Sequence, residues 1–317
     1  MLFNIYNIGD IMENEEIVKI VDKYNSKIMY EQIKLLKKRY DFLEVTSIGK
    51  SVLGKDISCL CFGKGEKEIM FNASIHANEW ITSLLLMKFL EWLSFTYNQK
   101  NDMCNIYGIE EIYNTRKIYF IPMVNPDGVD IVNTNLQEDK KIIQIKDNYP
   151  NILFPSGWKA NFNGVDLNLQ FPANWEKAKE IKSSQGFTTP APRDFVGIAP
   201  LTEPESLALY TFTQTHNFER VIAYHTQGKV IYYNYLDMLP PNTLKIARLM
   251  SKYSGYLLED TPYSSSFAGY KDWFIQEYNR PGFTIEAGIG QSPVPISQFK
   301  QIYKDNFGII MTGIMYD

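Results

Sequence analysis

The sequence predicts an α/β fold in which a sheet is covered by helices on both faces. Strand-like apolar runs alternate with segments whose apolar residues recur at helical spacing. The strands are apolar almost throughout, as expected when both faces of a sheet are buried. The 317 residues are 45% hydrophobic and 14% aromatic, which is enough for a substantial core and excludes a globally disordered chain. This length allows one large α/β domain or two small ones.

The order of the elements follows from the apolar pattern. Helical spacing predicts helices over residues 29–40, 79–97, 243–258, 270–278 and 296–315. Apolar runs predict strands over residues 45–48, 57–62, 69–74, 117–124, 221–224, 230–233 and 282–286. The tetrapeptide NPDG at 125–128 predicts a turn after the fourth of these strands. Residues 135–200 are rich in Asn, Pro and Gly and predict a long irregular insertion, a kind of loop that often carries function.

Composition excludes several partners and sites. The net charge of −4 gives no basic footprint, so nucleic acid is not expected as a partner. No apolar run approaches the roughly 20 residues that cross a bilayer. The N-terminus lacks the basic start and apolar segment of a signal peptide, so a cytoplasmic location is expected, with secretion as the alternative. Cys59 and Cys61 share one face of a predicted strand without further ligands nearby, and core packing is expected for them.

Two of the three histidines look like zinc ligands. His76 directly follows one apolar run, Glu79 comes three residues later, and His225 ends another apolar run. Two histidines and one carboxylate form a known catalytic zinc set, which leaves the fourth position open for water. Loops at the carboxyl ends of strands are where open α/β sheets place ligands. The third histidine, His216, lies in a polar stretch and is expected on the surface.

With these residues in place, the chain resembles the zinc carboxypeptidases, the carboxypeptidase A-like metallopeptidases. The resemblance covers roughly residues 26–317. It rests on ordered motifs, which are IGKSVLGK at 48–55, HANEW at 76–80, NPDG at 125–128, GVDLN at 164–168, His225, and FTIE at 283–286. It implies a twisted mixed parallel and antiparallel sheet of about eight strands flanked by helices. It also implies one catalytic zinc held by His76, Glu79 and His225, a catalytic domain over 26–317, and an N-terminal extension over 1–25.

Further motifs resemble one bacterial branch of this family. They are WKAN at 158–161, GVDLNL at 164–169, HTQG at 225–228 and NRPGF at 279–283. The branch contains γ-D-glutamyl-meso-diaminopimelate peptidases that cut cell-wall peptides. The resemblance therefore implies a peptide or muropeptide substrate; oligomeric state stays open.

Two residues depart from the digestive members of the family. Those enzymes have Asn-Arg where this chain has Asn168 and Leu169, and that arginine grips the terminal carboxylate of the substrate. Leucine has no hydrogen-bond donor, so ordinary C-terminal carboxypeptidase action is not favoured. Lys159 stands where the family often has an arginine that stabilises the oxyanion, and lysine offers the charge without the bidentate fork.

The remaining candidate residues come from the same resemblance. Glu286 is expected to act as general base and later as proton donor to the leaving amine, and Lys159 to stabilise the oxyanion. Asn168 is expected to hydrogen-bond the substrate. Tyr263 is the nearest match to the family's mobile tyrosine, with Tyr270 as the alternative. Lys271 is expected to pair with a diaminopimelate carboxylate, and Arg280 is an equal candidate for that contact.

The favoured function is zinc-dependent hydrolysis of an amide bond in peptidoglycan-derived peptides, between γ-D-Glu and meso-diaminopimelate or a related diamino acid. Three alternatives stay open at this point. Two are enzymes, a conventional metallocarboxypeptidase and a zinc N-acyl amino acid amidohydrolase. The third is a peptide-binding module that has lost catalysis, which the intact set of His76, Glu79, His225 and Glu286 does not favour.

Overall fold

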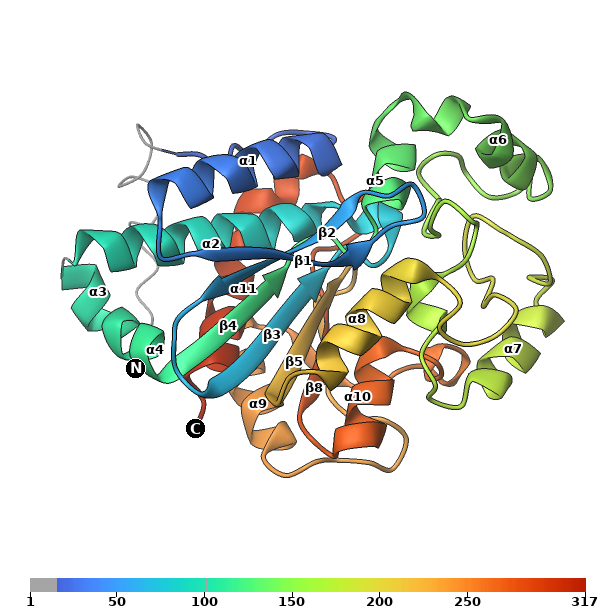
Figure 1. Ribbon diagram of the computed structural model, residues 1–317. Coiled ribbons are helices and arrows are strands. Elements are labelled where there is room, and N and C mark those ends of the chain that lie inside the picture. The colour runs from blue at the N-terminus through green and yellow to red at the C-terminus, as the bar shows by residue number, and fades with distance from the viewer. Residues whose placement is uncertain (1–15, 101) are drawn as a thin grey trace.

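The computed structural model describes residues 16–100 and 102–317 and contains an eight-stranded sheet between two layers of helices (Figure 1). The strand order is β1-β2-β4-β3-β5-β8-β6-β7. The four central strands β4, β3, β5 and β8 are mutually parallel. On either side of them, β2 runs antiparallel to β4, and β6 runs antiparallel to β8. The mixed sheet of about eight strands expected from the sequence is therefore confirmed.

The strands are β1 (Glu44–Lys50), β2 (Asp56–Phe62), β3 (Lys67–Ala73), β4 (Arg116–Ile121), β5 (Phe218–His225), β6 (Val230–Tyr232), β7 (Leu257–Glu259) and β8 (Gly282–Glu286). The α-helices of the described residues are α1 (Ser26–Arg39), α2 (Ile81–Gln99), α3 (Asp102–Ile106), α4 (Ile109–Thr115), α5 (Pro126–Asn133), α6 (Lys140–Asp147), α7 (Trp175–Ser184), α8 (Pro204–Gln214), α9 (Thr243–Ser254), α10 (Tyr270–Tyr278) and α11 (Phe299–Met315). Short 3₁₀ turns include η1 (Ala77–Glu79), η3 (Leu167–Leu169) and η4 (Tyr263–Ser265).

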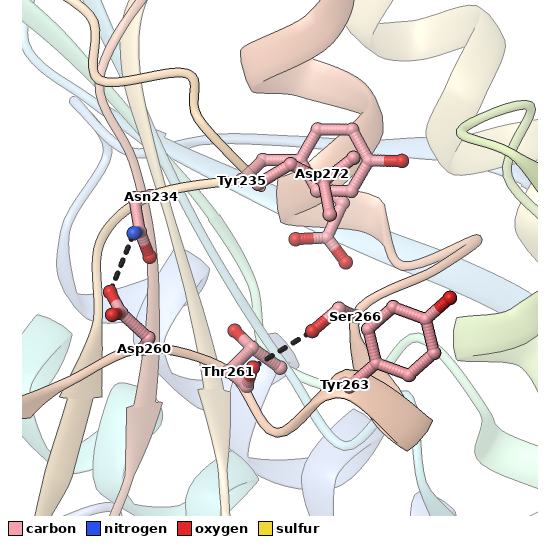
Figure 2. Close-up of a pocket in the computed structure, with 8 residues that line it drawn as sticks. Asn234, Tyr235, Asp260, Thr261, Tyr263, Ser266 and Asp272 are labelled. Carbon is pink, nitrogen blue, oxygen red and sulfur yellow. Dashed lines mark hydrogen bonds between the residues drawn. The ribbon is translucent and has the colours of Figure 1, made fainter.

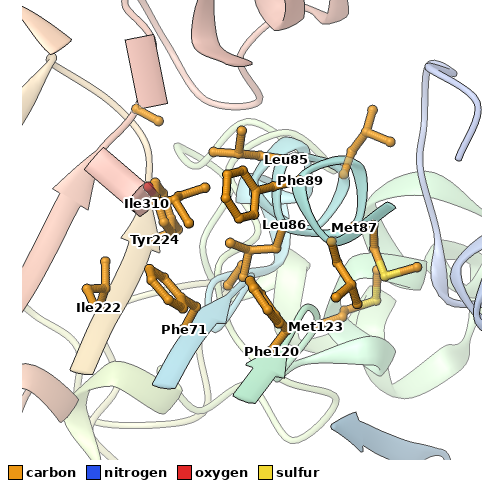
Figure 3. Close-up of a cluster of buried hydrophobic side chains, with 14 of the residues drawn as sticks. Phe71, Leu85, Leu86, Met87, Phe89, Phe120, Met123, Ile222, Tyr224 and Ile310 are labelled. Atoms are coloured by element: carbon orange, nitrogen blue, oxygen red, sulfur yellow. The ribbon is translucent and has the colours of Figure 1, made fainter. Parts of the chain in front are cut away.

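Each face of the sheet has its own apolar core. On one face, Phe71 and Phe120 of adjacent strands stack at 5.4 Å between ring centroids, and α2 lies over them (Figure 3). The helices α1 and α11 belong to this layer, while α8 and α10 cover the opposite face (Figure 1). Successive residues of β3 alternate between the two cores, since Phe71 belongs to the first and Met70 to the second. This burial on both faces explains why the central strands are apolar throughout.

Three sequence expectations were wrong in detail. The NPDG segment begins helix α5, because the side chain of Asn125 accepts from Gly128 N at 2.9 Å and Pro126 fits the first turn. The helix expected over 243–258 ends at Ser254, where Gly255 adopts φ +75°, and β7 follows. The insertion over 135–200 is only partly irregular, since it contains α6 and α7 (Figure 1).

His216 is not a simple surface residue. Its ring is half-buried among Tyr119, Phe212 and Phe218, and Nδ1 lies 2.7 Å from the carbonyl oxygen of Phe212. The polar residues beside His216 in the sequence predicted exposure, whereas aromatic side chains from other parts of the fold pack against its ring.

Cys59 and Cys61 are buried, as expected for core packing, and the described cysteines Cys59, Cys61 and Cys104 form no disulfide.

Residues 16–25 pack against the body of the fold. The backbone N–H groups of Ile17 and Val18 donate to Glu91 Oε1 of α2, at 2.5 and 3.2 Å, and Val18 is fully buried. The division of the chain at residue 26 stays a prediction, and residues 1–15 of the expected extension lie outside the described residues. Among residues 16–100 and 102–317, no helix combines the length and apolarity needed to cross a membrane.

Candidate metal centre and active site

The candidate site lies at the carboxyl ends of three neighbouring parallel strands. β3 ends just before His76, β5 ends at His225 and β8 ends at Glu286. His225 and Glu286 occupy paired positions in the register of β5 and β8. The order of the strands thus brings together residues that are up to 210 positions apart in the chain.

The turn that carries His76 and Glu79 is held from inside the fold. Ser74 has a left-handed backbone with φ +47°, which turns the chain sharply after β3. Its N–H donates to Thr82 Oγ1 at 3.1 Å, and its hydroxyl lies 2.6 Å from Ser83 Oγ. The first turn of α2 therefore fixes the path of the η1 turn that places Glu79 beside His76.

The ligand atoms of His76, Glu79 and His225 lie at mutually similar distances. His76 Nδ1 lies 3.0 Å from Glu79 Oε1 and 3.2 Å from His225 Nδ1, and His225 Nδ1 lies 3.0 Å from Glu79 Oε2. Tetrahedral ligands at the roughly 2.0–2.1 Å typical of zinc would be about 3.3 Å apart. The residues therefore fit a zinc ion both in spacing and in their two-imidazole, one-carboxylate chemistry.

Asp166 orients the first histidine. His76 Nε2 lies 3.1 Å from Asp166 Oδ1, and an ionised carboxylate only accepts hydrogen bonds. The proton of a neutral His76 therefore sits on Nε2 and leaves the Nδ1 lone pair toward the other two ligands. Asp166 belongs to the GVDLN motif, but the sequence analysis assigned it no role. Its position two residues before Asn168, a candidate substrate contact in the same motif, could have indicated that it belongs to the site.

The pKa values of the candidate ligands reflect a balance between burial and the charges of their neighbours. Burial favours neutral imidazole, but the Glu79 carboxylate outweighs that effect and raises the pKa of His76 to about 9. For His225 burial prevails and lowers the pKa. Burial would raise the pKa of Glu79, yet His76, Lys159 and His225 together hold it well below its ordinary range. Glu79 is therefore ionised, as a metal ligand must be.

Lys159 places a positive charge beside the candidate ligands. Its Nζ lies 3.2 Å from Glu79 Oε1, and its carbonyl oxygen accepts from Ala77 N at 3.0 Å. Burial acts to lower the pKa of this ammonium, but attraction by Glu79 raises it above its ordinary value. Asn125 Nδ2 donates to the carbonyl oxygens of Ile75 and Ala160, at 3.2 and 3.1 Å, and so ties the ligand turn to the segment that carries Lys159.

Glu286 shares a cavity of about 190 Å³ with His76, His225 and Lys159. Burial, with a further contribution from Glu79, raises the pKa of Glu286 to about 8. The same cavity is lined by two of the residues expected to bind substrate, Asn168 and Lys271. Asn168 Oδ1 accepts from Tyr270 N at 3.1 Å, so its amide N–H₂ is the group left for the cavity.

Other sequence candidates lie elsewhere. Tyr270 is buried and its hydroxyl lies 2.9 Å from Thr213 Oγ1, so it does not cover the site. Tyr263 is 64% exposed on η4 and lines a neighbouring cavity. Arg280 Nη1 donates to the carbonyl oxygen of Phe218 at 2.7 Å, which anchors the start of β5. Leu169 is buried in a small apolar cluster with Trp175, Val196 and Phe267.

Comparison with known proteins gives consistent matches over most of the chain. The model of the family described as zinc carboxypeptidase matches residues 29–308. The chain is 44% identical over 298 residues to gamma-D-glutamyl-L-diamino acid endopeptidase 1 of Lysinibacillus sphaericus, covering 92% of this chain and 72% of that protein.

Solved structures share the fold at low sequence identity. Bovine thrombin-activatable fibrinolysis inhibitor aligns with a TM-score of 0.69 and 19% identity, over 92% of this chain and 96% of that one. Murein-tripeptide amidase MpaA from Escherichia coli O157 aligns with a TM-score of 0.50 and 18% identity, over 84% and 91%. The family model and the relative cover most of the chain, and the candidate ligands meet at the carboxyl ends of β3 and β5. This chain therefore belongs to the zinc carboxypeptidase family and is a zinc metallopeptidase.

Proposed function

We propose that this protein hydrolyses the amide bond between γ-D-Glu and a diamino acid, such as meso-diaminopimelate, in peptides derived from peptidoglycan. The substrate class is supported by the 44% identity, over 92% of the chain, to a γ-D-glutamyl-L-diamino acid endopeptidase. The observation that carries hydrolysis is the group His76, Glu79 and His225 beside Glu286 in one cavity.

The three-residue group would hold one zinc ion, which supplies positive charge that acidifies a nearby water and polarises the scissile carbonyl. Glu286, at the end of β8, would accept the proton of the attacking water and pass it to the leaving amine. Lys159 would stabilise the negative charge that develops on the carbonyl oxygen, because it lines the cavity and its Nζ lies 3.2 Å from the ligand Glu79. The Asn168 amide would hydrogen-bond the substrate.

Leu169 weighs against an ordinary carboxypeptidase. Its side chain is turned into an apolar cluster and is absent from the lining of the cavity, so this position offers no donor to a terminal carboxylate. A carboxypeptidase needs such a donor because an unpaired buried carboxylate is costly. We therefore expect the enzyme to need no free C-terminal α-carboxylate beside the bond it cuts.

The test uses synthetic L-Ala-γ-D-Glu-meso-diaminopimelate and a blocked dipeptide ending in Phe, with products identified by mass spectrometry. We expect release of diaminopimelate from the tripeptide with a kcat/KM at least tenfold above that for the dipeptide. A preference for the dipeptide would contradict the proposal and identify the enzyme as an ordinary carboxypeptidase. Absence of turnover on both substrates by the zinc-loaded protein would also overturn the proposal.

A further inference from the structure

The chain segment around Arg193 is fastened to the catalytic loop on both sides of that residue. Before it, the carbonyl oxygen of Pro192 accepts from the backbone N–H of Lys159 at 2.7 Å. After it, the backbone N–H of Asp194 donates to Asp166 Oδ2 at 3.2 Å. Arg193 thus stands between a contact to the oxyanion lysine and a contact to the residue that orients the first histidine ligand. The proposed hydrolysis gives Arg193 no role.

The guanidinium of Arg193 is held in place but only partly used. Its Nε donates to Asp194 Oδ2 at 2.6 Å, and the buried ammonium of Lys182 donates to Asp194 Oδ1 at 2.6 Å, so two cations share one carboxylate. Neither Nη1 nor Nη2 of Arg193 donates to a residue within 16–100 or 102–317, and the side chain is 40% exposed. Because guanidinium donors form a planar fork, the two Nη groups remain available for a planar anion.

The charge of Arg193 reaches the active site. Burial acts to lower the pKa of Arg193, but Asp194, and further Asp166 and Glu79, raise it above its ordinary value. In return, Arg193 acts together with burial to lower the pKa of Lys159, although Glu79 prevails and raises it. Lys159 is itself paired with Glu79, with Nζ 3.2 Å from Oε1. Arg193 is therefore a cation near the site whose donors the site leaves unpaired.

Arg193 lies on the side of the site that would hold the residue before the cut bond. Along the short segment 166–168, Asp166 meets the Arg193 loop, whereas Asn168 Oδ1 accepts from the first backbone N–H of α10. The α10 side carries Lys271, the residue expected to contact the diamino acid, and opens into the neighbouring cavity of Figure 2. Because the two halves of a substrate extend in opposite directions from the cut bond, the acyl half faces the Arg193 loop.

The proposed substrate has a free carboxylate on this acyl half. D-Glu is joined through its side-chain carboxyl, so its α-carboxylate stays ionised a few bonds from the carbonyl that is attacked. An ordinary α-linked peptide has no carboxylate at that place. We propose that Nη1 and Nη2 of Arg193 bind the α-carboxylate of γ-D-Glu through paired hydrogen bonds, which makes Arg193 a residue that selects the γ-linkage. The inference rests on the proposed function and assigns the specificity of the same site.

The test compares L-Ala-γ-D-Glu-meso-diaminopimelate with the same tripeptide in which an amide replaces the α-carboxylate of D-Glu. That change removes the charge and keeps the shape, so the zinc-loaded wild type should show a kcat/KM at least about tenfold lower for the amide peptide. Arg193→Gln should lower kcat/KM for the acid peptide at least about tenfold, mainly through KM, and remove most of the preference. Arg193→Lys should keep part of it, since lysine has the charge without the fork. Arg248→Gln, at an exposed position on α9, is the matched control and should match the wild type.

The outcomes separate this inference from the proposed function. Equal or faster cleavage of the amide peptide by the wild type would overturn carboxylate recognition and leave γ-D-glutamyl hydrolysis standing. A preference that survives Arg193→Gln would place the carboxylate elsewhere and would also overturn the assignment. A purely structural role of Arg193 would give that second result, because activity on both peptides would fall together; zinc content and circular dichroism check the folding. Failure of the zinc-loaded wild type to cut either peptide would overturn the proposed function itself.

Discussion

The two glutamates of the site differ in charge state because of their immediate neighbours. Glu79 is surrounded by His76, His225 and Lys159, which hold its pKa well below the ordinary range. Glu286 faces the same cavity and forms no ion pair with any described residue, and burial, with Glu79 nearby, raises its pKa to about 8. A bound divalent cation would lower the pKa of Glu286, since a nearby positive charge favours the ionised form. Residue identity alone does not distinguish a ligand from a base.

Replacing Glu286 by Gln should abolish most turnover while zinc stays bound. Gln is nearly isosteric but cannot take the proton of water, so kcat should fall at least about 10²-fold. Steady-state kinetics on the γ-D-Glu tripeptide and zinc analysis check this, with Glu259→Gln at an exposed strand end as control. Turnover near the wild-type level would show that Glu286 is not the base.

Zinc affinity should depend on His76 and on the residue that orients it. His76→Ala should lose the ion, and Asp166→Asn should weaken zinc binding about 10- to 100-fold, as is typical for partners of ligating histidines. Competition with a chelator measures both. His216→Ala is the matched control, since His216 packs among aromatic rings away from the other two histidines. Equal zinc retention by His76→Ala and the wild type would sink the ligand assignment.

At the scale of elements, the start of helix α5 connects the parts of the site. Asn125 caps the helix by accepting from Gly128 N, and its amide donates to Ile75 and Ala160, which precede the ligand turn and follow Lys159. Its side chain is completely buried. Asn125 thus ends the loop that follows β4, caps α5 and holds two loops of the site together.

Asn125→Ala should destabilise the protein more than removal of an ordinary helix cap. Loss of the cap costs about 1 kcal/mol, and two buried carbonyl oxygens that lose their donor add roughly 1 kcal/mol each. Asp139→Ala provides the comparison, because Asp139 caps α6 through Lys141 N alone, at 2.8 Å. Urea unfolding of both variants gives the difference. Equal losses of unfolding free energy would refute the bridging role.

At the scale of the whole molecule, Glu205 joins three distant segments. Its carboxylate accepts from Val52 N at 3.0 Å and from Asn161 Nδ2 at 3.1 Å, which links α8 to the β1–β2 turn and to the insertion. Burial, with Asp127 adding to it, raises the pKa of Glu205 to about 7. Between the ordinary pKa and this value the folded state binds more protons than the unfolded one, so the stability contributed by neutral Glu205 is lost as pH rises through about 7.

Glu205→Gln should therefore gain stability relative to the wild type as pH increases from 5 to 8. The relative gain is at most about 3 kcal/mol, since each unit of pKa shift corresponds to about 1.4 kcal/mol. Chemical denaturation of both proteins at each pH, with zinc present, gives the difference directly. Glu176→Gln, at an exposed position on α7, should show no such trend. A flat difference for Glu205→Gln would contradict its protonation in the fold.

The sequence predicted much of the fold because apolar spacing reports burial. The strand over 282–286 and the helix over 270–278 match β8 and α10 residue for residue. The short strand β7 and the helices α3, α4 and α8 were missed. β7 has only three residues, none of them buried, and it pairs with β6 alone. Such an element is decided by its neighbour in the sheet, which local periodicity does not report.

The sequence by itself determined the family, the zinc chemistry and the three residues that can bind the ion, because those depend on residue types in a fixed order. Tertiary structure decided what depends on distance. It placed Asp166 on His76, buried Tyr270 away from the site and joined Lys271 to Asp272. It also brought Asp260 and Asp272 to one cavity from a loop and a helix. Strand order and side-chain direction determine those contacts, and the local pattern of the sequence predicts neither of them.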